Sequence, residues 1–257
     1  MAVAVFDLDG TIYFERQLAE HICTAVEQWR RAGHLAVIAT GKSPAGVRDA
    51  LDGTPLQYDY VIASTGAALY DATGGYLHHS SIPTDCVRDL VDLAQGLSDV
   101  AVFACTLESR DLRLYDSTTD SHNFVLDDFI DVDIVDLPRH TVTQVPFWVP
   151  HDEAKLQLLF DKISSVPTIT PVRNQDFIDI APKGISKGAG LQWLIDHLGL
   201  HEQPIFTFGD SWNDLTMHAL AHRSFSLPWS PAEVKQATDE VVDSVSDALG
   251  ELLNQLP

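Results

Sequence analysis

Short, uninterrupted apolar runs recur along the chain, and several of them stop at a polar residue. The first covers residues 2–6 and ends at Asp7. A strand of a parallel sheet is buried on both faces, so it reads as such a run and becomes polar where it emerges at its carboxyl end. Between the runs, apolar residues recur at helical spacing, as they do at Leu18, Ile22, Val26 and Trp29. This alternation predicts an α/β fold with a parallel sheet.

The first part of the chain has the rhythm of a βαβαβ unit. We expect its strands at residues 2–6, 34–39 and 60–63. The first helix ends near Gly33, a residue suited to a helix C-cap, and the second covers residues 44–51 behind Ser43, with a proline at its first position. The crossovers between these parallel strands should be right-handed.

The same rhythm returns in the last part of the chain. Ser186 is placed to cap a helix that runs through Leu198 and ends at Gly199. We then expect a strand at residues 205–208, a helix at 214–221, short strands at 225–227 and 241–242, and an amphipathic segment with Val245, Leu249, Leu252 and Leu253.

Between these two parts the pattern is mixed, with helices next to hairpins. We expect a helix with Val87, Leu90, Val91 and Ala94 on one face, another at residues 152–163, and strands near residues 100–105, 111–116, 141–149 and 168–180. This order indicates a compact α+β insert rather than further βαβ units. The predicted division is therefore residues 1–80 and 183–257 for the core and residues 81–182 for the insert, which is long enough for a small core of its own.

Composition narrows the classes of partner. The 37 acidic and 16 basic residues leave a net charge of −21, which would repel the phosphate backbone, so a nucleic-acid binder is disfavoured. No apolar run reaches the roughly twenty residues of a membrane span, and the start has no signal-peptide pattern, so we expect a soluble, unexported protein without a membrane partner. The cysteines are odd in number and widely spaced, at Cys23, Cys86 and Cys105, which favours a reducing cytoplasm over disulfides or a zinc site. We expect a monomer or a homodimer.

The sharpest feature is Asp7-Leu8-Asp9-Gly10-Thr11, directly after a buried strand. Ligands of open α/β sheets bind beyond the carboxyl ends of the strands, so two carboxylates placed there suggest a bound cation. Mg²⁺ prefers oxygen ligands and takes one or two carboxylates together with substrate phosphate oxygens. Asp7 could then attack phosphorus as a nucleophile, and Asp9 could serve as general acid and base. The structural alternative is a simple turn between strand and helix.

Three further segments could complete such a site. Thr40-Gly41, at the end of the second strand, offers a hydroxyl and backbone N–H groups to phosphate, and Lys187 offers a fixed positive charge. Asp210 and Asp214 would bring two more carboxylates to the same sheet edge, where they would repel without a divalent cation. Taken singly, these residues also fit an ordinary turn, a surface lysine and a helix N-cap.

The four segments, in this order, resemble the motifs of the haloacid dehalogenase superfamily of phosphohydrolases. DLDGT is similar to its first motif, ATG to its second, Lys187 in ISKG to its third, and GDSWND to its fourth. The resemblance implies a Rossmann-like core with an inserted cap and a phosphorylated aspartate. The size and position of the α+β insert resemble the C2-type cap of the Cof-like branch, whose members commonly hydrolyse sugar phosphates and related small metabolites.

The resemblance also assigns roles to residues. It implies Asp7 as nucleophile and Asp9 as general acid/base, while Thr40, Gly41 and Lys187 hold the phosphoryl group. Asn213 would orient Lys187 or the phosphate. It implies a Mg²⁺ ion bound by the Asp7 carboxylate, the Asp9 backbone carbonyl and Asp210, with Asp214 acting through water.

These assignments predict a Mg²⁺-dependent phosphatase acting on small phosphorylated metabolites, with sugar phosphates foremost. One alternative is a phosphomutase, which needs Asp7 and Asp9 but must return the phosphoryl group to its substrate. Another is a non-catalytic metabolite-binding protein on the same scaffold. That reading predicts the loss of a catalytic carboxylate, and the four expected aspartates are all present.

Two residues depart from the pattern of the branch. Lys42 follows Thr-Gly where Arg is usual, which keeps the charge but not the bidentate fork. Thr65 precedes Gly66-Ala67 where Asn is usual.

Cys105 lies in an apolar segment and is expected to be a buried small hydrophobe. Candidate cap contacts to a substrate, for each of which a solvated surface position is the simpler interpretation, are Arg110, Arg113, His122, Arg173, Asn174 and Asp176.

Overall fold

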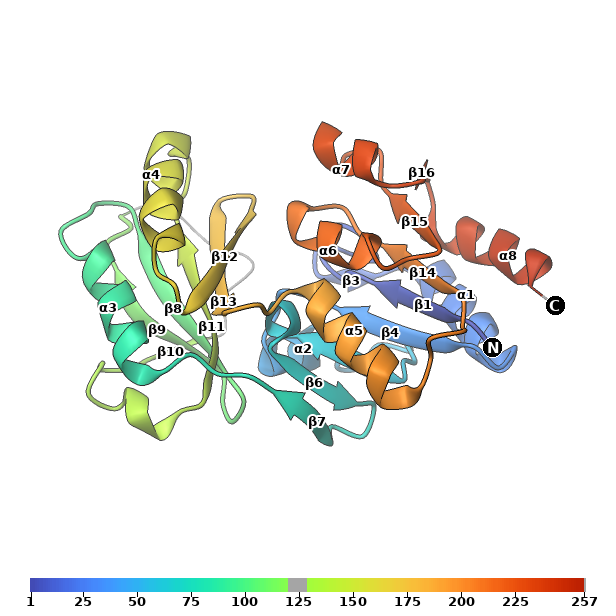
Figure 1. Ribbon diagram of the computed structural model, residues 1–257, viewed down its shortest axis with the longest axis horizontal. Helices are drawn as coiled ribbons and strands as arrows, with labels where there is room; N and C mark the ends of the chain where they lie inside the picture. The colour runs from blue at the N-terminus through green and yellow to red at the C-terminus, as the bar shows by residue number, and fades with distance from the viewer. Residues whose placement is uncertain (120–128, 257) are drawn as a thin grey trace.

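The structure, a computed structural model, describes residues 1–119 and 129–256 and arranges its strands in two large sheets and one small hairpin. The two sheets form two lobes, which the chain connects twice (Figure 1). We call the eight-stranded sheet the core sheet and the six-stranded sheet the cap sheet. Within the described residues, no helix is both long and apolar enough to cross a membrane.

The core sheet has the strand order β16-β15-β14-β1-β4-β5-β6-β7. Its strands from β16 to β5 are parallel, and β6 and β7 add an antiparallel edge. The parallel strands are β1 (Val3–Phe6), β4 (Leu35–Ala39), β5 (Tyr60–Ala63), β14 (Ile205–Phe208), β15 (Arg223–Ser226) and β16 (Glu240–Val241); the edge strands are β6 (Ala68–Asp71) and β7 (Tyr76–His79).

Helices cover both faces of the core sheet, which explains why its strands are apolar throughout. Ala4 and Phe6 of β1 pack on one side with α1 (Glu20–Arg31), α2 (Pro44–Leu51) and α8 (Val245–Gln255). Val3 and Val5 of the same strand pack on the other side with α5 (Lys187–Leu198) and α6 (Leu215–His218). Because both faces of these strands are buried, their sequences are apolar throughout and do not alternate between polar and apolar residues.

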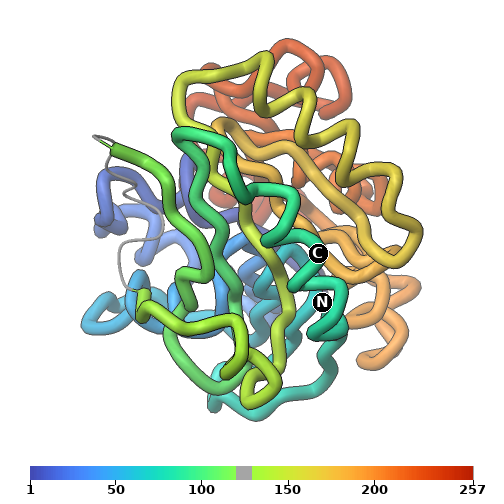
Figure 2. The backbone as a smooth tube through the Cα atoms, turned by 90° about the vertical axis from the view of Figure 1, so that its left-hand side faces the viewer, coloured from blue at the N-terminus to red at the C-terminus, as the bar shows by residue number. Residues whose placement is uncertain are grey.

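The cap sheet has the order β10-β9-β8-β11-β13-β12 and is largely antiparallel. Its strands are β8 (Ala101–Thr106), β9 (Asp111–Asp116), β10 (Phe129–Asp131), β11 (Val142–Trp148), β12 (Ile169–Asn174) and β13 (Phe177–Pro182). Helices α3 (Thr84–Ala94) and α4 (Glu153–Ser164) pack on one face around their own apolar cluster. Figures 1 and 2 show these helices on the side away from the core, so the other face of the cap sheet turns toward it.

The α/β fold with a parallel sheet and an α+β insert is confirmed, but one predicted strand was wrong and several short elements were not predicted. The single strand expected at residues 168–180 is the β12–β13 hairpin, whose turn places Gln175 at φ 51°. Neither a glycine nor an asparagine-glycine or aspartate-glycine pair marks that turn, so the strongest hairpin signal is absent there. The elements that were missed are the hairpin of β2 (Tyr13–Phe14) and β3 (Gln17–Leu18), strand β10 and helix α7 (Ala232–Ala237). The division at residues 81 and 182 stays a proposal.

Gly66 sets the distance between β5 and α5. It ends the short helix η1 (Ser64–Gly66) with φ 104°, and a Cβ atom at this position would overlap the carbonyl oxygen of Ser186. Ser186 caps α5 by accepting the Ala189 N–H at 3.0 Å. The missing side chain of Gly66 therefore lets the first residue of α5, Lys187, reach the carboxyl edge of the core sheet.

We predict that Gly66→Ala destabilises the protein much more than Gly74→Ala does. Both glycines have positive φ, but nothing lies within 4 Å of a Cβ at Gly74. Gly74→Ala should cost about 1 kcal/mol from backbone strain alone, and Gly66→Ala about 3 kcal/mol or more, because it adds a backbone overlap. Thermal unfolding of both variants measures the difference, and equal losses would show that the close approach at Ser186 is unimportant.

Candidate active site

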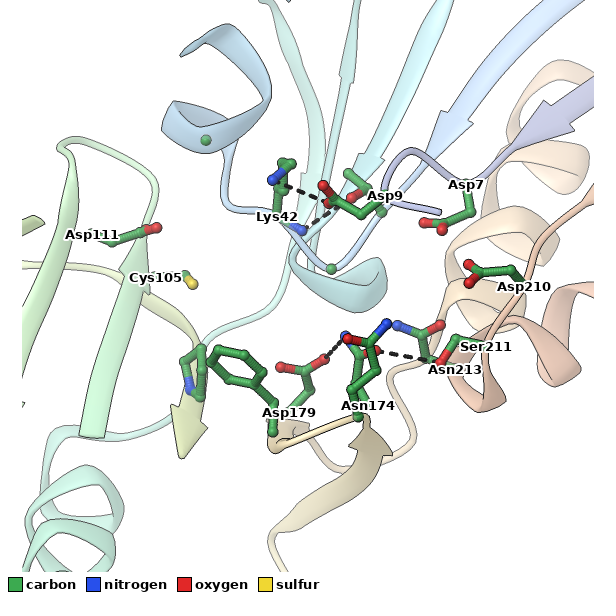
Figure 3. A pocket seen from close by; sticks show the side chains of 16 residues that line it. Asp7, Asp9, Lys42, Cys105, Asp111, Asn174, Asp179, Asp210, Ser211 and Asn213 are labelled. Atoms are coloured by element: carbon green, nitrogen blue, oxygen red, sulfur yellow. Dashed lines mark hydrogen bonds and ion pairs between the residues drawn. The ribbon is translucent and has the colours of Figure 1, made fainter. Parts of the chain in front are cut away.

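The predicted site residues meet at the carboxyl edge of the core sheet. Residue Phe6 of β1 pairs with Ile38 of β4 on one side and with Phe208 of β14 on the other. The residues that follow these strands, Asp7, Thr40 and Asp210, therefore emerge next to each other. All three line one cavity between the core and the cap sheet (Figure 3).

Lys187 lies beneath this cavity and is fully buried. Its Nζ atom donates one hydrogen bond to Asp7 Oδ1 and one to Asp214 Oδ1, each 2.6 Å long. Burial alone would lower the pKa of Lys187. The negative charges of Asp214 and Asp7 raise this pKa by more than burial lowers it, so the pKa lies above its usual value. The ammonium group is therefore permanently charged and fixed in position.

Three carboxylates share the space around this single ammonium group. Asp7, Asp210 and Asp214 each offer an oxygen within 4.8 Å of the others. Burial, with repulsion from Asp214 and Asp210, raises the pKa of Asp7 well above its usual value despite the attraction of Lys187. Burial and the charge of Asp214 likewise raise the pKa of Asp210 to about 7. Three acids against one lysine leave an excess of negative charge, so this donor set fits a divalent cation with oxygen ligands such as Mg²⁺.

Asp214 has both oxygens engaged by the protein. Its Oδ1 accepts from Lys187, and its Oδ2 accepts the backbone N–H groups of Asp210 at 3.0 Å and Ser211 at 2.9 Å. It therefore anchors both the lysine and the loop that carries Asp210. Its assignment as a ligand that acts through water stays a prediction.

Asp9 lies in a different environment from Asp7. Its side chain is 44% exposed, and Lys42 Nζ lies 3.0 Å from its Oδ2 atom. The Lys42 backbone N–H also donates to Thr40 Oγ1 at 3.1 Å, which ties the loop after β4 to its own side chain. Lys42, named from the sequence only as a departure from the family pattern, is thus the ion-pair partner of Asp9.

Thr40, Gly41 and Asn213 line the same cavity as Asp7 and Asp210. Asn213 is buried, and its Oδ1 atom has no hydrogen-bond partner among the described residues. No hydrogen bond joins it to Lys187 in that part of the chain, so its predicted role toward the lysine stays a prediction. Thr65 lies behind Gly41 with φ 54°, in the left-handed region that Asn adopts more readily than Thr.

The cavity extends from the core to the cap sheet and is partly open to solvent, and the centres of water-sized molecules can occupy about 100 Å³ of it. A concave space with both apolar and polar groups in its wall suits a small metabolite. The cap residues that line it are Cys105, Asp111, Pro146, Asn174, Gln175, Phe177 and Asp179. Cys105 is buried as expected, and burial raises the pKa of its thiol well above its usual value, which disfavours the nucleophilic thiolate form.

Of the cap candidates from the sequence, Asn174 lies in the cavity wall. Arg113 instead pairs with Asp131 and Asp116, and Arg173 pairs with Glu153. Arg110 and Asp176 are not among the described lining residues, and His122 lies outside the described part of the chain. Sequence reasoning missed Asp111, Phe177 and Asp179. The one signal for Asp179 was its polar side chain in the otherwise apolar Phe177–Pro182 strand.

Comparisons with known proteins show what this chain is similar to. A curated HMP-PP phosphatase from Enterobacter sp. (strain 638) is 27% identical over 224 residues, which cover 84% of this chain and 79% of the relative. A haloacid dehalogenase-like hydrolase from B. subtilis matches with a TM-score of 0.85 and 18% identity, over 98% of this chain and 100% of that one. A sugar phosphatase of HAD subclass IIB matches with a TM-score of 0.80 and 20% identity, over 98% and 99% of the two chains.

The sequence model of the haloacid dehalogenase-like hydrolases matches residues 4–250, which include every site residue discussed above. The resemblance inferred from the four motifs is thereby confirmed. The chain belongs to the family of haloacid dehalogenase-like hydrolases.

Proposed function

We propose that this protein is a Mg²⁺-dependent phosphatase that hydrolyses small phosphorylated metabolites, with sugar phosphates foremost, through a phospho-aspartyl intermediate on Asp7. The observation that carries this proposal is the contrast between two aspartates at one strand end. Asp7 is buried against Lys187, whereas Asp9 is half exposed at the cavity beside Lys42. The names of the relatives, HMP-PP phosphatase and sugar phosphatase, support the same reaction class.

The reaction divides into two steps. In the first, an Asp7 oxygen forms a bond to phosphorus, the bond from phosphorus to the leaving oxygen breaks, and Asp9 gives its proton to that oxygen. In the second, Asp9 takes a proton from water, the water oxygen bonds to phosphorus, and the bond from phosphorus to Asp7 breaks. Phosphate leaves, Asp7 regains its carboxylate, and Asp9 regains its proton.

The surrounding residues position the phosphoryl group in this scheme. Lys187, held at 2.6 Å from Asp7, supplies positive charge at the attacking carboxylate. Thr40 and Gly41 would donate hydrogen bonds to the phosphoryl oxygens, and Asn213 would add its amide N–H groups. Donors fixed in advance by the fold stabilise charge in the transition state without reorganising.

Mg²⁺ would be held by the carboxylates of Asp7 and Asp210 and the backbone carbonyl of Asp9, with Asp214 acting through water. The bound ion supplies positive charge to the phosphoryl oxygens during transfer. Gly10 supports this arrangement, because a Cβ atom there would overlap the Asp210 carboxylate. The excess of carboxylates over Lys187 is the observation that favours the ion.

We predict that Asp7→Asn abolishes phosphate release, because it removes the nucleophile, and that Asp9→Asn slows it by about 10²- to 10⁴-fold. The measurement is phosphate release from a panel of sugar, nucleotide and cofactor phosphates, with Mg²⁺ and with EDTA. Asp85→Asn, at a side chain that is 91% exposed, is the matched control and should keep full activity. Full turnover in clean Asp7→Asn protein would refute the mechanism, and phosphoryl transfer without release of phosphate would indicate a mutase.

We predict that metal-free protein loses stability as the pH rises and that Asp210→Asn removes part of this loss. In the folded protein the pKa of Asp210 is raised to about 7, from an ordinary value of 3.8. The contribution of Asp210 to the free energy of unfolding is therefore fully present below its unfolded pKa and is lost as the pH rises through its folded pKa. In EDTA at pH 8 the variant should be more stable than the wild type by about 1 kcal/mol or more.

Thermal unfolding with and without Mg²⁺ measures both effects, with Asp85→Asn again as the control. Mg²⁺ should raise the melting temperature of the wild type at pH 8 and of Asp210→Asn much less. The assignment of Asp210 as a ligand fails if the variant responds fully to Mg²⁺ or gains no stability in EDTA.

A further inference from the structure

Two carboxylates of the cap sheet reach into the cavity, and the mechanism above uses neither. Asp111, the first residue of β9, is 6% exposed and points into the space on the far side from Asp7 and Asp210 (Figure 3). Its Oδ1 atom has no hydrogen-bond partner among the described residues. Asp179, in the middle of β13, is 5% exposed and accepts one hydrogen bond from Asn174 Nδ2 at 3.1 Å.

The described part of the chain supplies no ion-pair partner to either carboxylate. Lys42 is the one cation among the described residues that line the cavity, and it pairs with Asp9. Burial raises the pKa of Asp111 to about 6, although hydrogen bonds from Ser43 and Cys105 oppose the rise. Burial likewise raises the pKa of Asp179 to about 6, against a hydrogen bond from Asn174. Near neutral pH both groups are therefore buried negative charges.

A buried acceptor without a donor costs free energy, and a ligand that supplies the donor recovers it. A ligand that brings a second negative charge to the same place is repelled instead. Beside the two carboxylates, Pro146 and Phe177 give the cavity an apolar wall, and the Phe177 ring is stacked on Trp148 with 6.4 Å between centroids. This wall suits the carbon skeleton of a leaving group.

We infer that Asp111 and Asp179 are specificity-determining residues, which select leaving groups that are uncharged or cationic and carry hydroxyl or amine donors, and which reject leaving groups with an additional anion. The inference rests on the proposed phosphatase function and adds to it the chemistry of the substrate. The charge of Lys42 also acts on Asp111, but Lys42 is paired with Asp9 at 3.0 Å and gives Asp111 no ion-pair partner.

Two matched pairs of substrates test the selection. Glucitol 6-phosphate and 6-phosphogluconate are both open chains, and the first carries a hydroxyl group at the end where the second carries a carboxylate. Glucose 6-phosphate and glucosamine 6-phosphate are rings that differ in a hydroxyl against an ammonium group. We expect kcat/KM for 6-phosphogluconate to be about tenfold or more below that for glucitol 6-phosphate, which equals about 1.4 kcal/mol. Glucosamine 6-phosphate should equal or exceed glucose 6-phosphate, and their ratio separates amine from hydroxyl recognition.

Variants then assign the selection to residues. Asp111→Asn and Asp179→Asn should each raise the ratio of kcat/KM for 6-phosphogluconate over glucitol 6-phosphate, and the double variant by about tenfold. The control is Asp176→Asn, an exposed aspartate on the same hairpin outside the described cavity wall, which should leave the ratio unchanged. A purely structural role would lower activity on all substrates together and leave this ratio constant.

p-Nitrophenyl phosphate, whose leaving group carries no donor for the cap, separates two kinds of failure. No release of phosphate from any compound, this one included, would refute the proposed function itself. Release from p-nitrophenyl phosphate with no turnover of the four sugar derivatives would overturn the inference alone. Equal kcat/KM values for glucitol 6-phosphate and 6-phosphogluconate would overturn the inference as well. So would an unchanged ratio of these two values in the double variant.

Discussion

The Lys187 ammonium group, wholly buried between Asp7 and Asp214, is the interaction on which the site depends. A buried ammonium ion without partners loses several kcal/mol of solvation, and carboxylates that share a buried space repel each other. The ammonium group between the two carboxylates offsets both the loss of solvation and the repulsion, provided that the segments that carry these three side chains lie very close together. Glycines permit this approach: a Cβ atom at Gly188 would overlap the Thr216 carbonyl group, and one at Gly209 would overlap the Asp214 carboxylate.

The core of the site could be predicted from the sequence because it follows from one geometric rule. Parallel strands end at the same edge of a sheet, so the sequence predicts that Asp7, Thr40 and Asp210 lie together. The depth of Lys187 was not predictable in the same way. A lysine near a helix start is usually solvated, and its burial depends on the contact of Ser186 with Gly66, which no local pattern reveals.

The cap side of the cavity was largely missed, for a physical reason. Which face of β13 turns toward the core depends on how α3 and α4 cover the opposite face of the cap sheet. Asp179 and Phe177 lie on one face of β13, and Ile178 and Ile180 lie on the other, within the apolar cluster. The turn at Gln175 gives little indication of this register, since it lacks the glycine pairs that most strongly mark a hairpin. Charged residues such as Arg113 and Arg173 looked suitable, but acidic neighbours engage them.

The second chain crossing between the lobes, residues 183–186, leads into Lys187 with no intervening residue. Any rotation of the cap would therefore pull on the backbone next to the ammonium group that Asp7 requires. Within this crossing, Gly184 has φ 78° and open space around it, whereas the Ser186 carbonyl lies against Gly66. The position of the ammonium group is therefore set by contacts within the core and not by the path of the chain that arrives from the cap.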